Sequence, residues 1–330
     1  MVSSHEEFGG YLPLELPPST GELYSDSPGF RVQRLNSGRA TFYFAALNAR
    51  PSKVFLPYFT CADTAEPFKK LGIAVDYYLL DDNLLPKDVE PKRGELVLWT
   101  NYYGNASKQS IQEAVKRYEN QIIVDNCHAF FSEPVKGALT SYSTRKFIGV
   151  SDGAYLVGNN VELPNDLAYD ESHSRLHHLT LQIELGVNAG YPDSLLNEIS
   201  VGSSYLRMSR FTRAVLSTID YSRIQRTRRE NFLRLHERLA KNNSFELNLA
   251  SKTHMYYPFM FPDRDLRRRL VDKKVFSPQW WSHVPSLVPS DSIEERLSSE
   301  MVMLPIDQRY RVEDMEKLAE IVTTELKARA

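Results

Sequence analysis

The chain has 330 residues and a mass of 37.9 kDa. This length predicts one large domain with a smaller one attached, because single hydrophobic cores rarely grow beyond about 250–300 residues. The 40 basic and 42 acidic side chains give a formal charge of −2. No overall electrostatic field therefore favours nucleic acid or an anionic membrane as a partner.

The sequence also argues against a secreted, membrane or metal-binding protein. Its start is acidic and carries Pro and Gly where a signal peptide would need a basic end and an apolar run, so we expect a cytoplasmic location. Cys61 and Cys127 are too few for a disulfide framework or a closed cysteine zinc site. His173 and His177 have helical spacing but lack the further ligands of a metal motif, so no metal site is expected.

From residue 37 to residue 158 the sequence alternates between helical patterns and short apolar runs. SGRATFYFAALNA (37–49) predicts a helix with Ser37 as its N-cap, starting directly from a loop at 31–36. Two further helices are predicted at 62–72 and 108–120. Strands are predicted at 53–60, 73–81, 95–104, 121–126, 138–143 and 153–158. This alternation predicts an α/β fold with a mainly parallel sheet covered on both faces.

The second half is less regular. Residues 159–201 have no clear pattern, and a long helical region is predicted over 207–242. The segment 245–281 then predicts a strand, a turn, a helix and a second strand, and 311–330 predicts a closing amphipathic helix. We therefore expect a large domain over 1–235, including an N-terminal arm, and a small α+β domain over 236–330.

Two local patterns point to ligand binding. LNSGRAT (35–41) is a helix start whose free N–H groups favour an anion, with Gly38 allowing close approach and Arg39 adding charge; an ordinary capped helix is the alternative. QIIVDNCHAFF (121–131) is a strand that ends in Asp125, with His128 three residues later. Polar residues beyond the carboxyl end of a parallel strand lie where ligands bind, although a turn cap and a structural histidine would look the same.

A third feature is Lys146, which lies between two predicted strands, 21 residues after Asp125. Lysine amines bond covalently to carbonyl groups, but most of the 40 basic side chains must be solvated. The order of the three features is informative. A pyridoxal phosphate site needs one group for the phosphate, one for the ring nitrogen and one for the aldehyde.

With these motifs the chain, from Leu35 to its end, resembles the DegT/DnrJ/StrS sugar aminotransferases, which are fold type I pyridoxal phosphate enzymes. The resemblance implies a mainly parallel seven-stranded sheet in the large domain. The family's phosphate-binding helix start is similar to Ser37-Gly38-Arg39-Ala40-Thr41, with Arg39 in place of threonine. The family's ring-stacking aromatic falls on Cys61, so we expect a neighbour such as Tyr58 or Tyr102 to compensate.

The resemblance also assigns the remaining cofactor contacts. It implies that Asp125 meets the pyridine nitrogen, that His128 lies near the ring oxygen, that Ser141 binds the phosphate and that Lys146 carries the cofactor covalently. Tyr205 stands where the family has an asparagine that reaches the partner subunit's phosphate. The family is homodimeric, so a homodimer is expected here too.

The implied function is a pyridoxal phosphate-dependent amino transfer, from an amino donor such as glutamate to a keto sugar. Two alternatives remain open at this level. One is an enzyme of the same fold that acts on a non-sugar substrate, which is favoured by the departures at Arg39, Cys61 and Tyr205. The other is a non-catalytic dimeric scaffold, which is disfavoured by the retention of Asp125 and Lys146 together.

Overall fold

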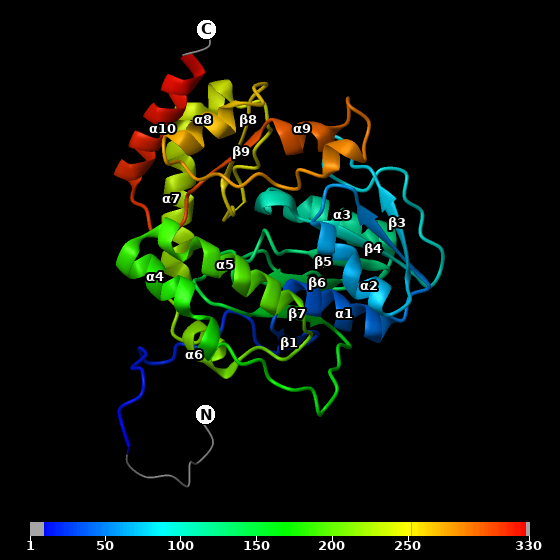
Figure 1. The fold of residues 1–330 in the computed structure, drawn as a ribbon. Helices are drawn as coiled ribbons and strands as arrows, with labels where there is room; N and C mark the ends of the chain where they lie inside the picture. Colours follow the sequence, from blue (N-terminus) through cyan, green and yellow to red (C-terminus); the bar gives the residue numbers. More distant parts are fainter. Residues whose placement is uncertain (1–9, 252, 328–330) are drawn as a thin grey trace.

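A computed structural model describes residues 10–251 and 253–327 (Figure 1). The acidic start of the chain over residues 1–9 and the last three residues of the predicted closing helix lie outside the described residues. In Figure 1 the central sheet is surrounded by helices, and the C-terminal elements, coloured yellow to red, gather at the top of the view. No helix among the described residues has the length and apolarity needed to cross a membrane.

The main sheet has seven strands in the order β1-β7-β6-β5-β4-β2-β3. Only the pairings that involve β7 are antiparallel. The predicted mainly parallel seven-stranded sheet is therefore confirmed. Its strands are β1 (Arg31–Leu35), β2 (Lys53–Pro57), β3 (Ala74–Tyr78), β4 (Glu95–Thr100), β5 (Ile122–Asp125), β6 (Leu139–Ser143) and β7 (Ala154–Gly158).

The first helices cover the sheet as the sequence predicts. They are α1 (Gly38–Ala49), α2 (Glu66–Lys70) and α3 (Lys108–Tyr118). Ser37 caps α1 by accepting a hydrogen bond from the amide of Ala40, and Ser107 caps α3 in the same way. Along β4, Leu96 and Leu98 pack on the α1–α2 side, and Val97 and Trp99 on the α3 side. Both faces of β4 are therefore buried, as expected for a central parallel strand.

Three predictions for the middle of the chain are wrong. Residues 31–35 form strand β1 rather than a loop. The segment 159–201 contains α4 (His177–Leu185) and most of α5 (Val187–Gly202), which holds Pro192 within its second turn. The predicted long helix over 207–242 is divided into α6 (Arg210–Leu216) and α7 (Tyr221–Leu239), because Asp220 caps a new helix start.

The C-terminal part forms a second core around a two-stranded antiparallel sheet. Its elements are β8 (Tyr257–Met260), α8 (Leu266–Asp272), α9 (Ile293–Ser299), β9 (Met301–Leu304) and α10 (Val312–Lys327). The closing helix is confirmed as α10, which packs on α7 and α8. The boundary predicted for the small domain, at residue 236, stays a prediction. α7 begins before this boundary and contributes Phe232 and Leu235 to the second core.

Within segment 245–281 the predicted strand, turn and helix are found as β8 and α8, whereas the predicted closing strand is absent and β8 pairs instead with β9. Residues 275–281 run past β9 with a side-chain contact, in which the amide of Met303 donates to the Ser277 hydroxyl at 2.9 Å. Pro278 has no N–H to offer to a strand ladder there. The remaining short 3₁₀ turns are η1 (Ala62–Ala65), η2 (Tyr102–Gly104), η3 (His173–Arg175), η4 (Ala240–Asn242) and η5 (Val284–Ser286).

His254 in the second core predicts acid sensitivity. Its ring stacks on Phe232 with centroids 3.9 Å apart, and both ring nitrogens are buried without a partner among the described residues. Burial lowers the pKa of His254 to about 3, and the charges of Arg229 and His236 act in the same direction. In the unfolded chain the pKa is about 6.5, so the unfolded state binds more protons between these two values.

We therefore expect the free energy of unfolding to fall as the pH drops from about 6.5 towards 3, by up to about 1.4 kcal/mol per pH unit from this residue. Urea unfolding at several pH values measures this slope. The variant His254→Leu is expected to show a smaller slope, whereas His173→Leu, at an exposed position, keeps the original one. Equal slopes in all three proteins would contradict this account of His254.

Candidate active site

Three neighbouring strands bring polar side chains to one edge of the sheet. Thr100 at the end of β4 pairs in register with Asp125 at the end of β5, and Asp125 pairs with Ser141 in β6. All three side chains are buried. Because these strands are parallel, this is the carboxyl edge, where ligands bind in open α/β sheets.

The first turn of α1 lies against the same edge. The Ser141 hydroxyl is 2.5 Å from the Thr41 hydroxyl, which itself donates to the carbonyl of Gly38 at 2.6 Å. Gly38 opens α1, and the first amides of a helix have no partner within the helix. The structure therefore brings together the two predicted phosphate contacts, Gly38 and Ser141.

Cys127 lies at the centre of this group. Its amide donates to the Asp125 carboxylate at 2.9 Å, and its sulfur is 3.7 Å from the Ser141 hydroxyl. A β-carbon on Gly38 would come within 3.2 Å of that sulfur. Burial raises the pKa of the Cys127 thiol and the charge of Asp125 adds to this effect, while Lys146 opposes it. Cys127 is therefore close to Gly38, Asp125 and Ser141, and its pKa responds to the charge of Lys146. The net effect keeps it a neutral thiol.

The sequence reasoning did not include Cys127 among the site residues. Its position between Asp125 and His128 in the motif was the available signal. A larger side chain at that position would crowd the first turn of α1, because the sulfur of Cys127 already lies close to Gly38.

Lys146 lies on the turn that follows β6 and is exposed. The amides of Phe147 and Ile148 donate to the carbonyl of Thr144 at 3.0 and 2.9 Å, which closes this turn. Among the described residues Lys146 forms no ion pair. The turn therefore fixes the backbone of Lys146, and its amine has no counter-ion among the described residues.

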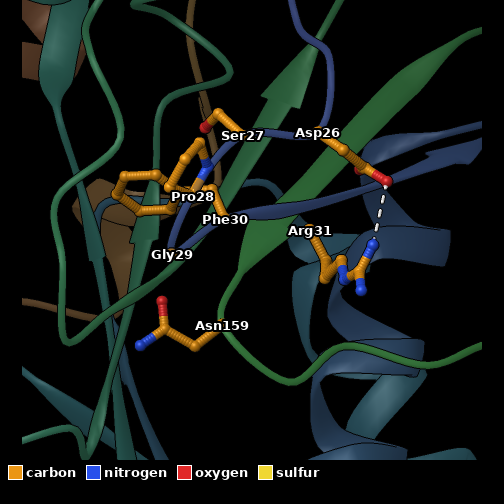
Figure 2. Close-up of a pocket in the computed structure, with 7 residues that line it drawn as sticks. All are labelled: Asp26, Ser27, Pro28, Gly29, Phe30, Arg31 and Asn159. Carbon is orange, nitrogen blue, oxygen red and sulfur yellow. Dashed lines mark hydrogen bonds and ion pairs between the residues drawn. The ribbon is translucent and has the colours of Figure 1, made fainter.

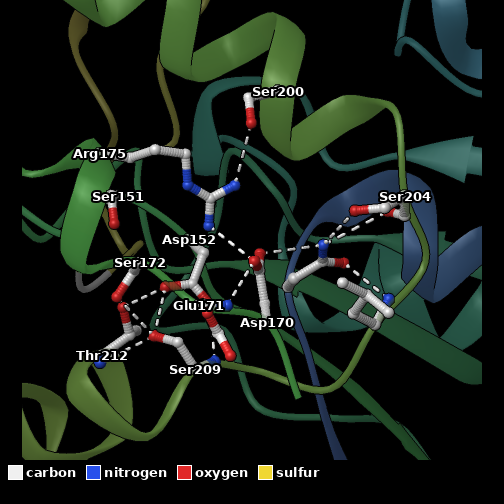
Figure 3. A network of polar contacts seen from close by, with 12 residues as sticks. Ser151, Asp152, Asp170, Glu171, Ser172, Arg175, Ser200, Ser204, Ser209 and Thr212 are labelled. Carbon is white, nitrogen blue, oxygen red and sulfur yellow. Dashed lines mark hydrogen bonds and ion pairs between the residues drawn. The ribbon is translucent and has the colours of Figure 1, made fainter. Parts of the chain in front are cut away.

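A buried polar network fixes the end of the loop that carries Lys146 (Figure 3). The Asp152 carboxylate accepts hydrogen bonds from the amide and the hydroxyl of Ser209, both at 2.7 Å, and from the Thr212 hydroxyl. Burial raises the pKa of Asp152, and these hydrogen bonds oppose the rise. Gly153 has a φ of 118°, and a β-carbon there would lie 2.6 Å from the Thr144 hydroxyl. Asp152 therefore anchors the loop to α6, and Gly153 lets the end of the loop pass close to Thr144 at its start.

His128 is buried beside aromatic rings from two other segments. Its ring centroid is 4.3 Å from that of Trp280, and its plane is parallel to Tyr103 within 2° at 6.3 Å. Burial lowers the pKa of His128 well below its usual value, and the charge of Lys146 lowers it further. His128 is therefore neutral at physiological pH, and its Nδ1 has no hydrogen-bond partner among the described residues.

Arg39 and Cys61 are placed differently from the other predicted residues. The Arg39 guanidinium pairs with Asp63 at 3.0 Å and contacts Glu198 of α5 at 3.6 Å, so its charge is already engaged. Cys61 is exposed and immediately precedes η1. The charge of Arg39 is therefore paired with carboxylates of this chain.

The candidates for replacing a ring at Cys61 are also occupied. Tyr58 stacks on Tyr77, and the buried Tyr102 donates its hydroxyl to the carbonyl of Phe59 at 2.7 Å. Trp281 covers Phe59, with centroids 4.5 Å apart, and it is only partly buried. The aromatic surface next to His128 therefore comes from Tyr103 and from the segment of Trp280 and Trp281.

In the described part of the chain, Lys146 is one of the residues that line a cavity of about 820 Å³. The hollow drawn in Figure 2 surrounds the Asp26–Arg31 ion pair and Asn159 and contains none of the predicted site residues. The His177 Nδ1 lies 3.2 Å from the Asp193 carboxylate, and no group of three or more metal-ligand side chains occurs among the described residues. Of the predicted site residues, Lys146 lines the larger cavity, and Asp125 and Ser141 lie at the sheet edge.

The sequence matches no protein-family model and no curated protein. Its structure is similar to solved aminotransferase structures over most of both chains. Spr1654 from Streptococcus pneumoniae, described as a sugar aminotransferase and solved in its PMP form, matches with a TM-score of 0.62 and 13% identity, covering 90% of this chain and 88% of that chain. The aminotransferase TlmJ from Streptoalloteichus hindustanus matches with a TM-score of 0.62 and 15% identity, covering 91% and 86%.

A DegT DnrJ EryC1 StrS aminotransferase from Brucella abortus matches with a TM-score of 0.57 and 16% identity, covering 89% of this chain and 85% of that chain. Identities of this size establish the fold alone. The chain therefore has the fold of the fold type I pyridoxal phosphate aminotransferases and is structurally similar to the sugar aminotransferases among them.

Proposed function

We propose that this protein is a pyridoxal phosphate-dependent aminotransferase that moves an amino group from glutamate to a keto sugar, nucleotide-linked sugars included. One observation carries the proposal. Asp125, Cys127 and Ser141 meet at the carboxyl edge of the sheet, and the charge of Lys146 lowers the pKa of both Cys127 and His128. Among them, Ser141, Asp125 and Lys146 supply the groups that the cofactor requires for its phosphate, ring nitrogen and aldehyde, on a fold whose solved examples include a PLP form.

The residues present fit the cofactor. The second oxygen of Asp125 has only a 3.4 Å contact from the Thr100 hydroxyl, which leaves it available to a ring nitrogen. The unpartnered Nδ1 of His128 suits a ring oxygen, and the helix start at Gly38 with Ser141 suits a phosphate. When bound, the cofactor supplies an aldehyde that bonds to amino groups and a ring that withdraws electrons from the reacting carbon.

The chain's own residues perform the positioning and the proton transfers. Lys146, exposed and without a counter-ion among the described residues, would move a proton from the donor's α-carbon to the cofactor, and in the second half of the reaction it would move one from the cofactor to the acceptor carbon that receives the amino group. Asp125 keeps a proton on the ring nitrogen through its negative charge. Trp280 and His128 restrict the access of water to this edge.

Incubation with pyridoxal phosphate followed by visible spectroscopy tests this proposal. We expect an absorbance band at roughly 410–430 nm that glutamate discharges, as in enzymes that carry the cofactor on a lysine. A panel of keto sugars and keto acids should then restore the band, and the sugars are expected to restore it faster. Absence of any band would leave the non-catalytic scaffold as the better account, and restoration by keto acids alone would favour the non-sugar alternative.

The expected homodimer is also part of the proposal. The hairpin of α4 and α5 exposes a row of large apolar side chains, which a monomer in water would not favour. They are Ile183, Leu185, Tyr191, Leu196 and Ile199, whose exposed fractions range from 60% to 85%. A second copy related by two-fold symmetry is the commonest way to cover such a surface. A cytoplasmic location, expected from the sequence, completes the proposal.

We expect Leu196→Glu to convert a dimer to a monomer, because it places a charge within the apolar surface of the hairpin. Light scattering after size-exclusion chromatography measures the mass. Leu249→Glu, at an exposed leucine outside the hairpin, is the matched control and should leave the dimer intact. A monomeric wild-type protein, or an unaffected Leu196→Glu dimer, would refute the assignment of this surface.

A further inference from the structure

The hairpin of α4 and α5 forms one wall of the cavity of about 820 Å³ that Lys146 also lines. Leu179 of α4 and Glu198 of α5 are among the lining residues, together with the turn 145–150 and Arg228 of α7. We propose that this hairpin is a movable flap over the cavity and that Glu198 is the latch that holds it closed. The proposal concerns the motion of the cofactor-free protein, so it does not depend on the aminotransferase chemistry.

The two helices of the hairpin form one rigid unit. They pack mainly on each other. A β-carbon on Gly190 of α5 would lie 2.5 Å from the carbonyl oxygen of His178 on α4, so this glycine allows the helices to approach closely. The His177 Nδ1 also lies 3.2 Å from the Asp193 carboxylate across the hairpin. We therefore expect α4 and α5 to move together.

The hairpin is attached to the large domain mainly near its base. α4 buries none of its residues, all of which the structure describes. Apart from Gly190, the buried residues of α5 are Asn197, Val201 and Gly202, in its last two turns. A swing of the hairpin away from the cavity would thus expose little apolar surface. Segments with few buried apolar contacts open at a low cost in free energy.

Polar contacts fix the base of the hairpin to the rest of the fold. The Asn197 side-chain amide donates to the carbonyl of Ser151 at 2.8 Å. Arg175, just before α4, donates to the Ser200 hydroxyl of α5 at 3.4 Å and pairs with Asp170 at 2.8 Å (Figure 3). These contacts hold the end of α5 beside the start of α4, so they suit a hinge about which the hairpin turns.

Glu198 joins the hairpin to the two ends of the candidate site. Its carboxylate pairs with Arg145, the residue before Lys146, and lies 3.6 Å from the Arg39 guanidinium. Arg39, in the first turn of α1, also donates to the backbone carbonyl of Glu198 at 3.3 Å. The guanidinium lies so close to Gly202 that no β-carbon would fit there. One side chain of α5 therefore connects the hairpin to the Lys146 turn and to the start of α1.

The exposure of these ion pairs suits a contact that breaks and re-forms. The Glu198 side chain is 57% exposed, whereas Arg39 and Arg145 are 18% and 19% exposed. Ion pairs with an exposed partner contribute little free energy and are screened by salt. Arg39 also keeps Asp63 as a partner at 3.0 Å, so departure of Glu198 does not leave this guanidinium unpaired. The carboxylate can therefore leave both arginines at a low cost.

Hydrogen exchange followed by mass spectrometry tests the latch on the full chain without cofactor. Glu198→Gln keeps the size of the side chain and removes its charge. We expect the amides of residues 177–196 to exchange about 3- to 10-fold faster in this variant, because the hairpin opens more often. Glu184→Gln is the matched control, since Glu184 is an exposed residue of the same hairpin that does not line the cavity. It should leave the exchange unchanged.

Salt and a second variant give independent measurements. In 1 M NaCl the Debye length falls to about 3 Å, so exchange of the wild-type hairpin should approach that of Glu198→Gln, which itself should change little. Arg145→Gln should also speed the exchange. The double variant should add little to either single one, because both remove the same contact. These measurements decide the matter even if Glu198→Gln does not fold.

Equal exchange of the hairpin in the wild type, Glu198→Gln and Arg145→Gln, with no effect of salt, would overturn the proposal. Faster exchange spread over the strands of the main sheet would also overturn it, because Glu198 would then stabilise the whole fold. The outcome is independent of the visible band. A latch can be found in a protein that binds no cofactor, and an aminotransferase can lack one.

Discussion

Replacement of Lys146 by alanine is expected to abolish the visible band of the cofactor-loaded protein and to lower kcat for amino transfer by about 10²–10⁴-fold. The reason is structural as well as chemical. Lys146 is the exposed lysine of the cavity, and its charge already acts on Cys127 and His128 at the edge of the sheet. No other lysine in the part of the chain that the structure describes lines that cavity.

Stopped-flow and steady-state assays with glutamate measure this loss. Lys136→Ala is the matched control, because Lys136 is an exposed lysine of the loop before β6 that does not line the cavity. It should leave both the spectrum and the rate unchanged. An unaltered spectrum and full activity in Lys146→Ala would show that another residue carries the cofactor.

The second large effect is expected at Asp125. We expect Asp125→Asn to lower kcat by about 10²–10³-fold, because a neutral amide no longer stabilises a proton on the ring nitrogen as charge develops. The fold should be little affected. The amide oxygen of asparagine can still accept the hydrogen bond that the Cys127 amide now donates at 2.9 Å.

Thermal unfolding and cofactor titration separate the two possible causes of a loss. A drop in kcat with an unchanged melting temperature and retained cofactor supports the role of Asp125 at the ring nitrogen. Full activity of Asp125→Asn would remove it from the mechanism. A variant that is inactive only because it unfolds would show that the carboxylate is structural.

Local sequence patterns predicted the parts of the fold that depend on local forces. Ser37 caps α1 as expected, and the strands predicted at 95–104, 121–126 and 138–143 contain β4, β5 and β6. Parallel strands place their carboxyl ends at one edge, so the order of motifs along the chain was enough to bring Asp125 and Ser141 together.

Elements that depend on distant partners were missed. β1 is a strand because it pairs with β7, whose residues lie more than 100 positions away. α4 and α5 pack mainly on each other and expose apolar side chains, so their sequence lacks the apolar stripe of a helix that packs on the core. β9 was missed as well. It pairs with β8, and the segment between them in the sequence includes the residues that were predicted to form a strand in its place.

The same reason limits the prediction of the site. The engagement of Arg39 by Glu198 could not be foreseen, since Glu198 lies on α5, in a segment without a helical pattern. Arg228 was one of many basic residues on a predicted helix, and only the fold places it beside the turn of Lys146. Cys127, in contrast, lies within the motif between Asp125 and His128, and its contacts with Asp125 and Ser141 appear only in the folded chain.

Covalent mapping of the cofactor tests the central claim most directly. The protein is incubated with pyridoxal phosphate, reduced with borohydride so that the cofactor stays attached to its lysine, digested and analysed by mass spectrometry. The account predicts that the label is found on the peptide that contains Lys146 and that it is absent from Lys146→Ala. Label on another lysine, or labelling that Lys146→Ala leaves unchanged, would contradict the account.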